Sequence, residues 1–263
     1  MLKKLNRIAY FMSKNTMYTI GAAVIILLGV GVFLLTRNSP TAQPMAEQNT
    51  GTPTAETKPQ DSNAEPTASA AKPENLNGCS RTVDRSKMTA ATVDFANKKV
   101  TLQVKGLGNI VIDLYDKDAP KTVENFVRLA GSGYFDCLTF HRVAKGFVIQ
   151  GGDPTGTGSG GETALGTTLV DELNQNTESY KAGYLKGVVA MANRGPNTNS
   201  SQFFIMLGNA DLPHQYTIFG KVSSGIEVVD KIGAMEIVPE LGPTDGKPKQ
   251  MVVIEKALVS NKQ

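Results

Sequence analysis

The stretch FHRVAKGFVIQGGD, residues Phe140–Asp153, contains parts of two predicted strands, 138–143 and 147–150. Arg142 lies in the first of them, between aromatic and β-branched residues. An Arg in such a run is usually a solvated residue on an exposed face. Here Phe147, Val148 and Gln150 follow a few positions later. The run can therefore place a cation beside an apolar patch.

A second informative stretch is GVVAMANRGPNTNSSQFFI, residues Gly187–Ile205. Its centre, from Asn193 to Gln202, is rich in amide and hydroxyl groups, which is also typical of an ordinary long turn. The run from Ser201 to Ile205 then starts a strand whose aromatic side chains must face a core or a pocket.

Outward from these two stretches, the chain consists of short apolar runs separated by turn signals. The alternating runs Lys99–Val104 and Asn109–Tyr115 flank Lys-Gly-Leu-Gly and predict a β-hairpin. The remaining predicted strands are Leu138–Val143, Phe147–Gln150, Val188–Ala192, Phe203–Leu207, Thr217–Val222 and Met251–Val259.

Two helices are predicted among these strands, Ala119–Gly131 and Gly225–Ile232. Pro120 suits the first turn of the former, and its stripe of apolar residues has helical spacing: Val123, Phe126, Val127 and Ala130. Many short strands with two helices indicate an antiparallel barrel or sandwich with helical caps.

The N-terminal part of the chain has a different composition. Residues 17–35 read MYTIGAAVIILLGVGVFLL without a charge, and 19 residues of helix span about 28 Å, close to a hydrocarbon core of about 30 Å. We expect a transmembrane signal-anchor helix over residues 17–36. A cleaved signal peptide is the alternative, although its apolar region is usually shorter, about 7–15 residues.

Charge predicts the orientation of this span. Lys3, Lys4, Arg7 and Lys14 precede it, so residues 1–16 should form a basic cytoplasmic N-terminus. Residues 37–80 are rich in Pro, Thr, Ala and Ser and should form a disordered linker. The globular domain should then cover residues 81–263 on the far side of a plasma membrane.

Several function classes are disfavoured by composition. With 27 basic and 24 acidic side chains, the chain has no charge footprint for nucleic acid. His141 and His214 stand too far apart to suggest a metal site. Gly156–Gly161 matches G-x-G-x-x-G, but no strand and helix flank it, so it reads as a loop and not as a cofactor site. Cys79 and Cys137 form no CxxC; sequence leaves open whether they pair or stay free.

Four blocks in this chain resemble the cyclophilin family in the family's order. They are NIVIDLYDKDAPKTVENF, FHRVAKGFVIQGGD, MANRGPNTNSSQFFI and HQYTIFGKV, within residues 95–259. The resemblance implies a mainly β fold, a closed eight-stranded antiparallel barrel capped by two helices. It also implies a peptidyl-prolyl cis-trans isomerase, or rotamase, that needs no metal or cofactor and acts as a monomer on proline-containing polypeptides.

The resemblance assigns site residues by position. Arg142 matches the catalytic arginine. The matching substrate-groove positions are Phe147, Val148, Gln150, Ala192, Asn193, Gln202, Phe204, Leu212 and Tyr216. Rotation about an amide meets a barrier of about 18–20 kcal/mol, and twisting it leaves a lone pair on the prolyl nitrogen. A guanidinium that donates to this nitrogen binds the twisted state better than the planar one, which is the condition for catalysis.

The resemblance also implies that Phe147, Val148, Phe204 and Leu212 form the walls of a slot for the proline ring. Two departures from the family pattern lie beside this slot. Many cyclophilins carry His where this chain has Tyr216, and a Tyr there still offers an apolar face with a polar tip. Many also carry a Trp before the position of Leu212, whereas this chain has no Trp. Since that Trp helps the family bind cyclosporin, we expect weak cyclosporin binding.

Three functions remain for this chain at the level of sequence. The favoured one is an isomerase that speeds proline-limited folding of extracytoplasmic proteins. The second is a cyclophilin fold that grips proline-containing segments with incidental turnover. The third, a structural membrane protein, is disfavoured because every catalytic-position residue is retained.

Overall fold

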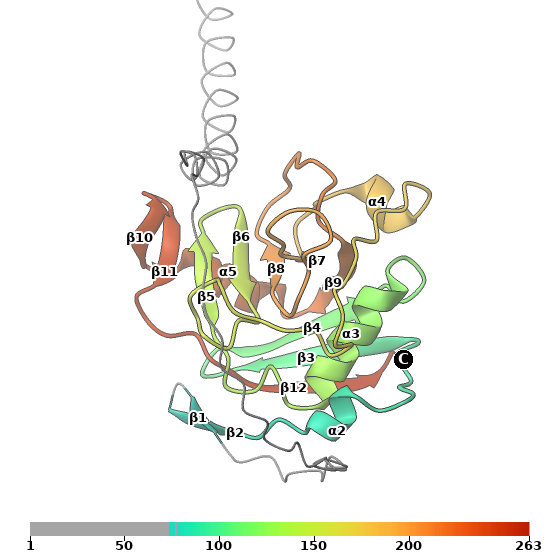
Figure 1. Ribbon diagram of the computed structural model, residues 1–263. Coiled ribbons are helices and arrows are strands. Elements are labelled where there is room, and N and C mark those ends of the chain that lie inside the picture. The colour runs from blue at the N-terminus through green and yellow to red at the C-terminus, as the bar shows by residue number, and fades with distance from the viewer. Residues whose placement is uncertain (1–73, 77, 263) are drawn as a thin grey trace, which may run out of the picture. The chain divides into compact units, whose positions relative to one another are not determined.

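The computed structural model describes residues 74–76 and 78–262, and this part is mainly β (Figure 1). Ten strands form one antiparallel sheet in the order β10-β11-β5-β6-β8-β7-β9-β4-β3-β12, and β1 and β2 form a separate two-stranded sheet. The strands are β1 Glu74–Leu76, β2 Cys79–Arg81, β3 Lys98–Val104, β4 Gly108–Leu114, β5 Phe140–Ala144, β6 Val148–Gly151, β7 Val188–Met191, β8 Phe203–Met206, β9 Ile218–Ser224, β10 Ile237–Gly242, β11 Asp245–Pro248 and β12 Ile254–Asn261.

All eight strands predicted from sequence are present, but the prediction of a closed eight-stranded barrel needs correction. The sheet has ten strands, and its end strands β10 and β12 do not pair with each other. The reason lies at β5, because two different segments bond to the edge of β5 that faces away from β6. Gly246 of β11 pairs with Val143, while the start of β5 and the residues before it bond to the start of β12 through the bridge Thr139–Val253 and the backbone hydrogen bonds of Cys137, Leu138 and Phe140.

Alternation in β3 and β4 follows from burial of one face. Val100 pairs with Ile112, and Leu102 with Ile110; all four side chains are fully buried. Because successive side chains of a strand point to opposite faces, the residues between them lie on the other face and are partly exposed.

Helix α3 (Pro120–Gly131) closes this core. Pro120 stands in its first turn and the predicted apolar stripe is buried. Phe126 lies at its centre, with ring centroids 4.9 Å from Phe135, 5.4 Å from Phe203 and 4.9 Å from Phe219. One helical side chain thus contacts both β8, through Phe203, and β9, through Phe219.

The second predicted helix is α5 (Ile226–Ala234), which buries Val228, Val229 and Ile232. Two short helices were not predicted, α2 (Arg85–Met88) and α4 (Glu178–Ala182). Each is too short to show apolar periodicity, and each depends on a side-chain cap, Asp84 for α2 and Thr177 for α4.

The hairpin β10–β11 was missed in the sequence for a similar reason. In β10 only Ile237 is buried, and Pro239 interrupts the run, so neither alternation nor β-propensity marks a strand. In Figure 1 the hairpin stands at the edge of the sheet beside β5.

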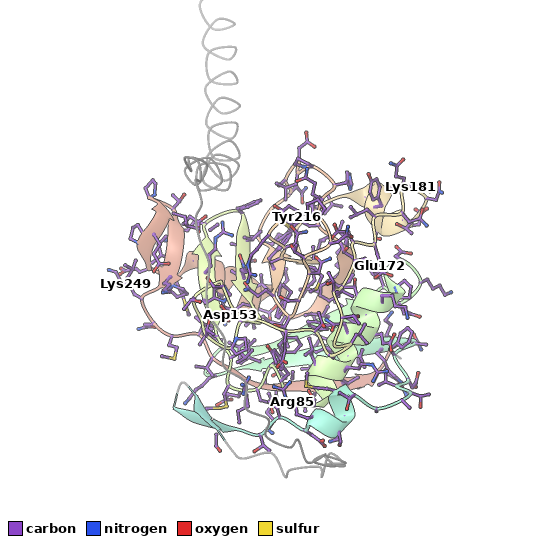
Figure 2. All side chains as sticks on the ribbon, viewed as in Figure 1. Arg85, Asp153, Glu172, Lys181, Tyr216 and Lys249 are labelled. Atoms are coloured by element: carbon purple, nitrogen blue, oxygen red, sulfur yellow. A yellow bond between two sulfur atoms is a disulfide. The ribbon has the colours of Figure 1, made fainter. Side chains whose placement is uncertain are left out.

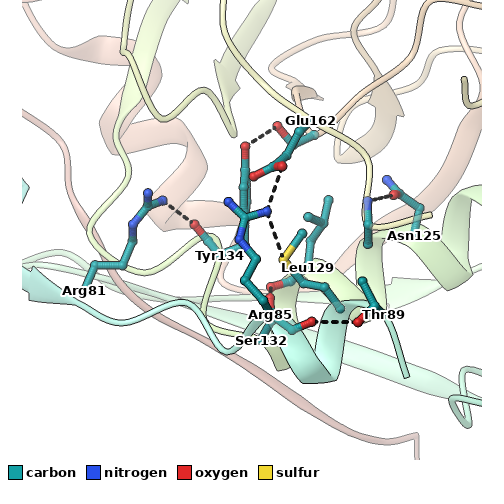
Figure 3. A network of polar contacts seen from close by, with 11 residues as sticks. Arg81, Arg85, Thr89, Asn125, Leu129, Ser132, Tyr134 and Glu162 are labelled. Atoms are coloured by element: carbon teal, nitrogen blue, oxygen red, sulfur yellow. Dashed lines mark hydrogen bonds and ion pairs between the residues drawn. The ribbon is translucent and has the colours of Figure 1, made fainter. Parts of the chain in front are cut away.

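The segment before the main sheet is tied down covalently. Cys79 of β2 and Cys137 form a disulfide, with their Cα atoms 5.6 Å apart, which settles the alternative that sequence left open. Arg81 Nη1 donates to the Tyr134 carbonyl at 2.9 Å, and Arg85 donates to Glu162 at 2.7 Å (Figure 3). The paired strands β1 and β2, within residues 74–81, overlap the end of the linker predicted over residues 37–80.

The predicted basic N-terminus, the transmembrane helix and most of the linker lie outside the described residues. Within the part of the chain that the structure describes, no helix is long and apolar enough to span a membrane.

Candidate active site

A single row of paired residues crosses the sheet from β5 to β9. Arg142 pairs with Gln150, Gln150 with Phe204, Phe204 with Ala190, and Ala190 with Ile218. Residues directly opposite each other in a sheet point to the same face. The arginine, the amide and the aromatic ring therefore share one face.

The opposite face of the same strands belongs to the main core. Val143, Ile149 and Ile205 alternate with the row and are fully buried in it. The strands therefore have an apolar inner face, and the face with Arg142 carries a second, separate apolar cluster.

The predicted slot residues gather in this second cluster. Its members from the prediction are Val148 and Phe204, which are buried, and Phe147, Ala192, Leu212 and Tyr216, which are partly buried. The Tyr216 ring meets Phe204 edge-on, with centroids 5.5 Å apart and an angle of 85°. In Figure 2 Tyr216 lies over β7–β9. The structure thus brings six of the predicted groove residues together in one apolar cluster.

Arg142 is held from two sides. Its Nε and Nη2 donate to the two oxygens of Asp245, at 2.8 and 2.6 Å, and its Nη1 donates to Gln150 Oε1 at 2.9 Å. The Arg142 side chain is 24% exposed and that of Asp245 21%. A guanidinium has five N–H donors; three are taken here, and the other two have no partner among the described residues, so they can bind a ligand.

Sequence reasoning missed Asp245 as a site residue. It lies 103 residues from Arg142 in a Thr-Asp-Gly turn that looks like any exposed turn. Only the pairing of β11 with β5 brings the carboxylate to the guanidinium, and no local signal in the sequence indicates that pairing.

The arginine is the first member of a hydrogen-bonded chain. Gln150 Nε2 donates to Gln202 Oε1 at 2.9 Å. The Gln202 amide nitrogen in turn donates to the carbonyls of Gly158 and Gly160, at 2.9 and 2.8 Å. The two predicted glutamines are therefore oriented, and their amides cannot rotate without losing a bond.

The glycine-rich loop at the end of this chain has its own anchor, Asp153, which is 1% exposed. Its carboxylate accepts from the backbone N–H of Thr155, Thr157, Gly158 and Gly160, at 2.7–3.2 Å. Burial alone would raise the pKa of this carboxyl, but these bonds outweigh it, and the pKa lies below its ordinary value. The backbone of the glycine-rich loop, which sequence predicted as a loop, therefore surrounds the Asp153 carboxylate.

At the other end of the site, Tyr184 supports the segment that carries Tyr216. The Tyr184 hydroxyl donates to the Tyr216 carbonyl at 2.9 Å and accepts from its N–H at 3.1 Å. Burial raises the pKa of Tyr184 to about 12, so it stays a donor. Asn193 donates to the Gln215 carbonyl at 2.8 Å, which connects the predicted peptide-binding loop to the same segment.

Beside Leu212 lies a cavity of about 350 Å³ that is also lined by Lys181, Tyr184 and His214. Leu212 and Tyr184 therefore belong both to the apolar cluster and to the lining of this cavity. His214 stacks on Tyr180, with ring centroids 3.9 Å apart, in keeping with the structural role expected for it.

The second histidine, His141, is 7% exposed, as expected for a packed residue. Neither ring nitrogen has a hydrogen-bond partner of normal geometry among the described residues. Burial lowers the pKa of His141 below its ordinary value, which keeps the imidazole neutral next to Arg142.

Chemically, this arrangement offers a positioned cation on the same face as an apolar cluster, flanked by oriented amides. Such a face can donate hydrogen bonds to a peptide and present apolar side chains to a ring such as that of proline. The geometry suits a reaction that needs charge stabilisation and no bond cleavage.

Comparison with known proteins defines the class. Residues 99–259 match the family model described as cyclophilin type peptidyl-prolyl cis-trans isomerase/CLD. Peptidyl-prolyl cis-trans isomerase CYP18-2 of Arabidopsis thaliana is 44% identical over 139 residues, which is 52% of this chain and 82% of that protein. The protein ppi1 of Schizosaccharomyces pombe, also a peptidyl-prolyl cis-trans isomerase, is 51% identical over 128 residues, 48% of this chain and 80% of that protein.

A solved structure shows the same fold. The cyclophilin type isomerase of Cryptosporidium parvum superposes with a TM-score of 0.56 at 33% identity, covering 63% of this chain and 99% of that one. The chain therefore belongs to the cyclophilin family, and it is a peptidyl-prolyl cis-trans isomerase.

Proposed function

We propose that Arg142 is the catalytic residue and that it stabilises the twisted Xaa-Pro amide in the slot formed by the second apolar cluster. The observation that carries this proposal is the cross-strand row, which places the guanidinium two strands from Phe204 on one face. Phe147, Val148, Phe204 and Leu212 would contact the proline ring, with Tyr216 at the rim.

The chemistry follows from the two free N–H groups. In the planar amide the prolyl nitrogen lone pair is delocalised and accepts poorly. As the bond twists, that lone pair localises, and an N–H of Arg142 donates to it. The apolar walls exclude water, so the charge acts at low dielectric and strengthens this bond in the transition state.

The remaining residues would hold the peptide on either side of proline. Gln150 and Gln202 are fixed by the bonds described above, and Ala192 and the backbone of Asn193 form the neighbouring edge. Preorganised groups of this kind reduce the entropy that binding must overcome.

We further propose that the enzyme acts as a monomer outside the cytoplasm, anchored by residues 17–36, with its N-terminus in the cytoplasm. Two features support this: the uncharged 19-residue run preceded by four basic residues, and the disulfide between Cys79 and Cys137, a bond that persists mainly in oxidising compartments. Its clients would be translocated proteins whose folding waits for slow Xaa-Pro isomerisation.

The test of the site compares the full chain with Arg142→Ala in isomerisation of a short Xaa-Pro peptide. We expect Arg142→Ala to lose at least about a hundredfold in kcat/KM, the scale seen when one preorganised donor is removed. Lys221→Ala, an exposed cation on β9, is the control and should stay near wild type. Equal activity of Arg142→Ala and wild type would refute the assignment.

A further inference from the structure

The cavity beside Leu212 shares a wall with the second apolar cluster. Tyr184, Ala210 and Leu212 line the cavity and also belong to that cluster, which contains Phe204 and Tyr216. The Tyr184 hydroxyl is bonded to the backbone of Tyr216, which fixes this wall relative to the cluster. A peptide whose proline lies in the proposed slot therefore has the cavity next to it.

The cavity lies between two short segments, one within residues 181–185 at the end of α4 and one within residues 209–214 after β8. Its volume is about 350 Å³, at the lower end of the range of roughly 300–1,000 Å³ for small-molecule sites. In Figure 2 Lys181 marks the α4 side of the cavity, at the same end of the domain as Tyr216. The space suits a single large side chain.

The charge of the lining is negative. With histidine counted as neutral at pH 7, the charged residues that line the cavity are Lys181 and Asp211. The Lys181 ammonium is already paired with Glu178 at 3.1 Å. The exposed Asp211 carboxylate has no ion pair or hydrogen bond within the part of the chain that the structure describes. The uncompensated charge beside the cavity is therefore that of Asp211.

Two backbone carbonyls at the end of α4 add to this negative character. The last carbonyls of a helix have no donor within the helix, and those of Lys181 and Ala182 accept no hydrogen bond from the described residues. The carbonyl end of a helix favours a nearby cation. These carbonyls and the Asp211 carboxylate thus ask for the same kind of occupant.

The apolar part of the lining suits the stem of a long side chain. Leu185 is 40% exposed, and Leu212 is partly buried at the wall shared with the second apolar cluster. Lys and Arg side chains pack their aliphatic stems along such surface and keep the charged end at polar groups.

We propose that this cavity is a specificity subsite for a basic side chain, Lys or Arg, of the client polypeptide. Asp211 binds the charged end, and Leu185 and Leu212 contact the stem. The inference rests on the proposed slot and adds a residue preference to it. The substrate class is then an Xaa-Pro segment with a basic residue within about three positions of the proline, the reach of an extended chain at about 3.3 Å per residue.

The test uses the full chain and peptides that differ at a single position. Lys, Met or Glu is placed in turn at each of three positions on either side of one Ala-Pro core, and kcat/KM is measured at pH 8 and low salt. Met is the reference because it is long and unbranched like Lys but carries no charge. The variants are Asp211→Asn, Asp211→Lys and, as the matched charge control, Glu255→Lys, which changes an exposed acid on β12.

We expect wild type to have a kcat/KM about two- to fivefold higher for the Lys peptide than for the Met peptide at one or two positions, the scale of one exposed ion pair. High salt should reduce this ratio. Asp211→Asn should bring the ratio to one, and Asp211→Lys should favour Glu over Lys. Glu255→Lys should keep the wild-type ratio, because the preference depends on a local charge.

Three results would overturn the inference: no Lys preference of wild type at any position, a Lys preference that persists in Asp211→Lys, or an equal loss of it in Glu255→Lys. Failure of the slot itself is recognised separately. Arg142→Ala would then leave kcat/KM on the Met peptides intact, whereas a correct slot assignment means that Arg142→Ala lowers it for the Lys, Met and Glu peptides together.

Discussion

Removing the Asp245 carboxylate tests whether Arg142 works as a positioned donor or as a mere local charge. In Asp245→Ala the guanidinium loses two of its three hydrogen bonds and keeps the one to Gln150. Its long side chain then gains rotamer freedom that it must lose again in each turnover.

The magnitude follows from the burial of the pair. Exposed pairs contribute about 0–1 kcal/mol, whereas breaking a fully buried pair costs about 3–5 kcal/mol. With side chains 24% and 21% exposed, we place the loss between these limits, at about 2 kcal/mol. Since about 1.4 kcal/mol is a factor of ten, kcat/KM should fall roughly thirtyfold.

The assay is isomerisation of a short Xaa-Pro peptide by wild type, Asp245→Ala and Asp245→Asn. The asparagine keeps an acceptor for one N–H, so Asp245→Asn should recover part of the loss. Glu240→Ala, which removes a half-exposed ion pair on the same hairpin, is the matched control and should stay near wild type. The double variant Arg142→Ala/Asp245→Ala should be no worse than Arg142→Ala alone.

The opposite result has a clear meaning. If Asp245→Ala equals or exceeds wild type, the carboxylate competes with substrate for the guanidinium, and the positioning argument is wrong.

Three further predictions concern the framework of the site. Cys79→Ser/Cys137→Ser opens a loop of 58 residues and should lower the unfolding free energy by up to about 4 kcal/mol, seen as a lower urea midpoint; an unchanged midpoint would show that the bond does not stabilise the domain. Gly160→Ala places a Cβ 2.1 Å from Asp153 Oδ1 and should destabilise by about 1–3 kcal/mol with reduced kcat/KM, whereas Gly131→Ala, whose Cβ would make an ordinary contact with Val259 at 3.9 Å, should keep activity. The pKa of His141 is lowered in the folded state. Its contribution to stability is therefore full above the ordinary His pKa, about 6.5, and is lost as pH falls through the lower folded-state pKa. The urea midpoint of wild type should drop more between pH 7 and 5 than that of His141→Phe, and parallel curves for the two proteins would contradict this.

The sequence predicts the strands and the groove because both depend on local pattern. The buried alternation of Val100, Leu102, Ile110 and Ile112 can be read directly, and the blocks around Arg142 and Gln202 predict which residues meet. The register of β5, β6 and β8 places Arg142, Gln150 and Phe204 on a common face.

What sequence could not predict depends on contacts between distant segments. Asp245 reaches Arg142 only through a hairpin whose strand β10 is exposed and interrupted by Pro239. The pairing of Cys79 with Cys137 depends on a Cα separation of 5.6 Å that no spacing rule supplies. The same edge contacts explain why the expected closed barrel is a ten-stranded sheet whose end strands β10 and β12 do not pair with each other.

The central claim is that Arg142 binds the twisted amide better than the planar one, and one experiment separates these two states. Exchange NMR on a single Xaa-Pro peptide gives both its dissociation constant and its bound-state isomerisation rate, for wild type and Arg142→Ala. We predict that the rate falls at least about a hundredfold while the dissociation constant changes less than about threefold. A loss that appears equally in the dissociation constant, with the bound rate unchanged, would show that Arg142 only holds the ground state and would contradict the account.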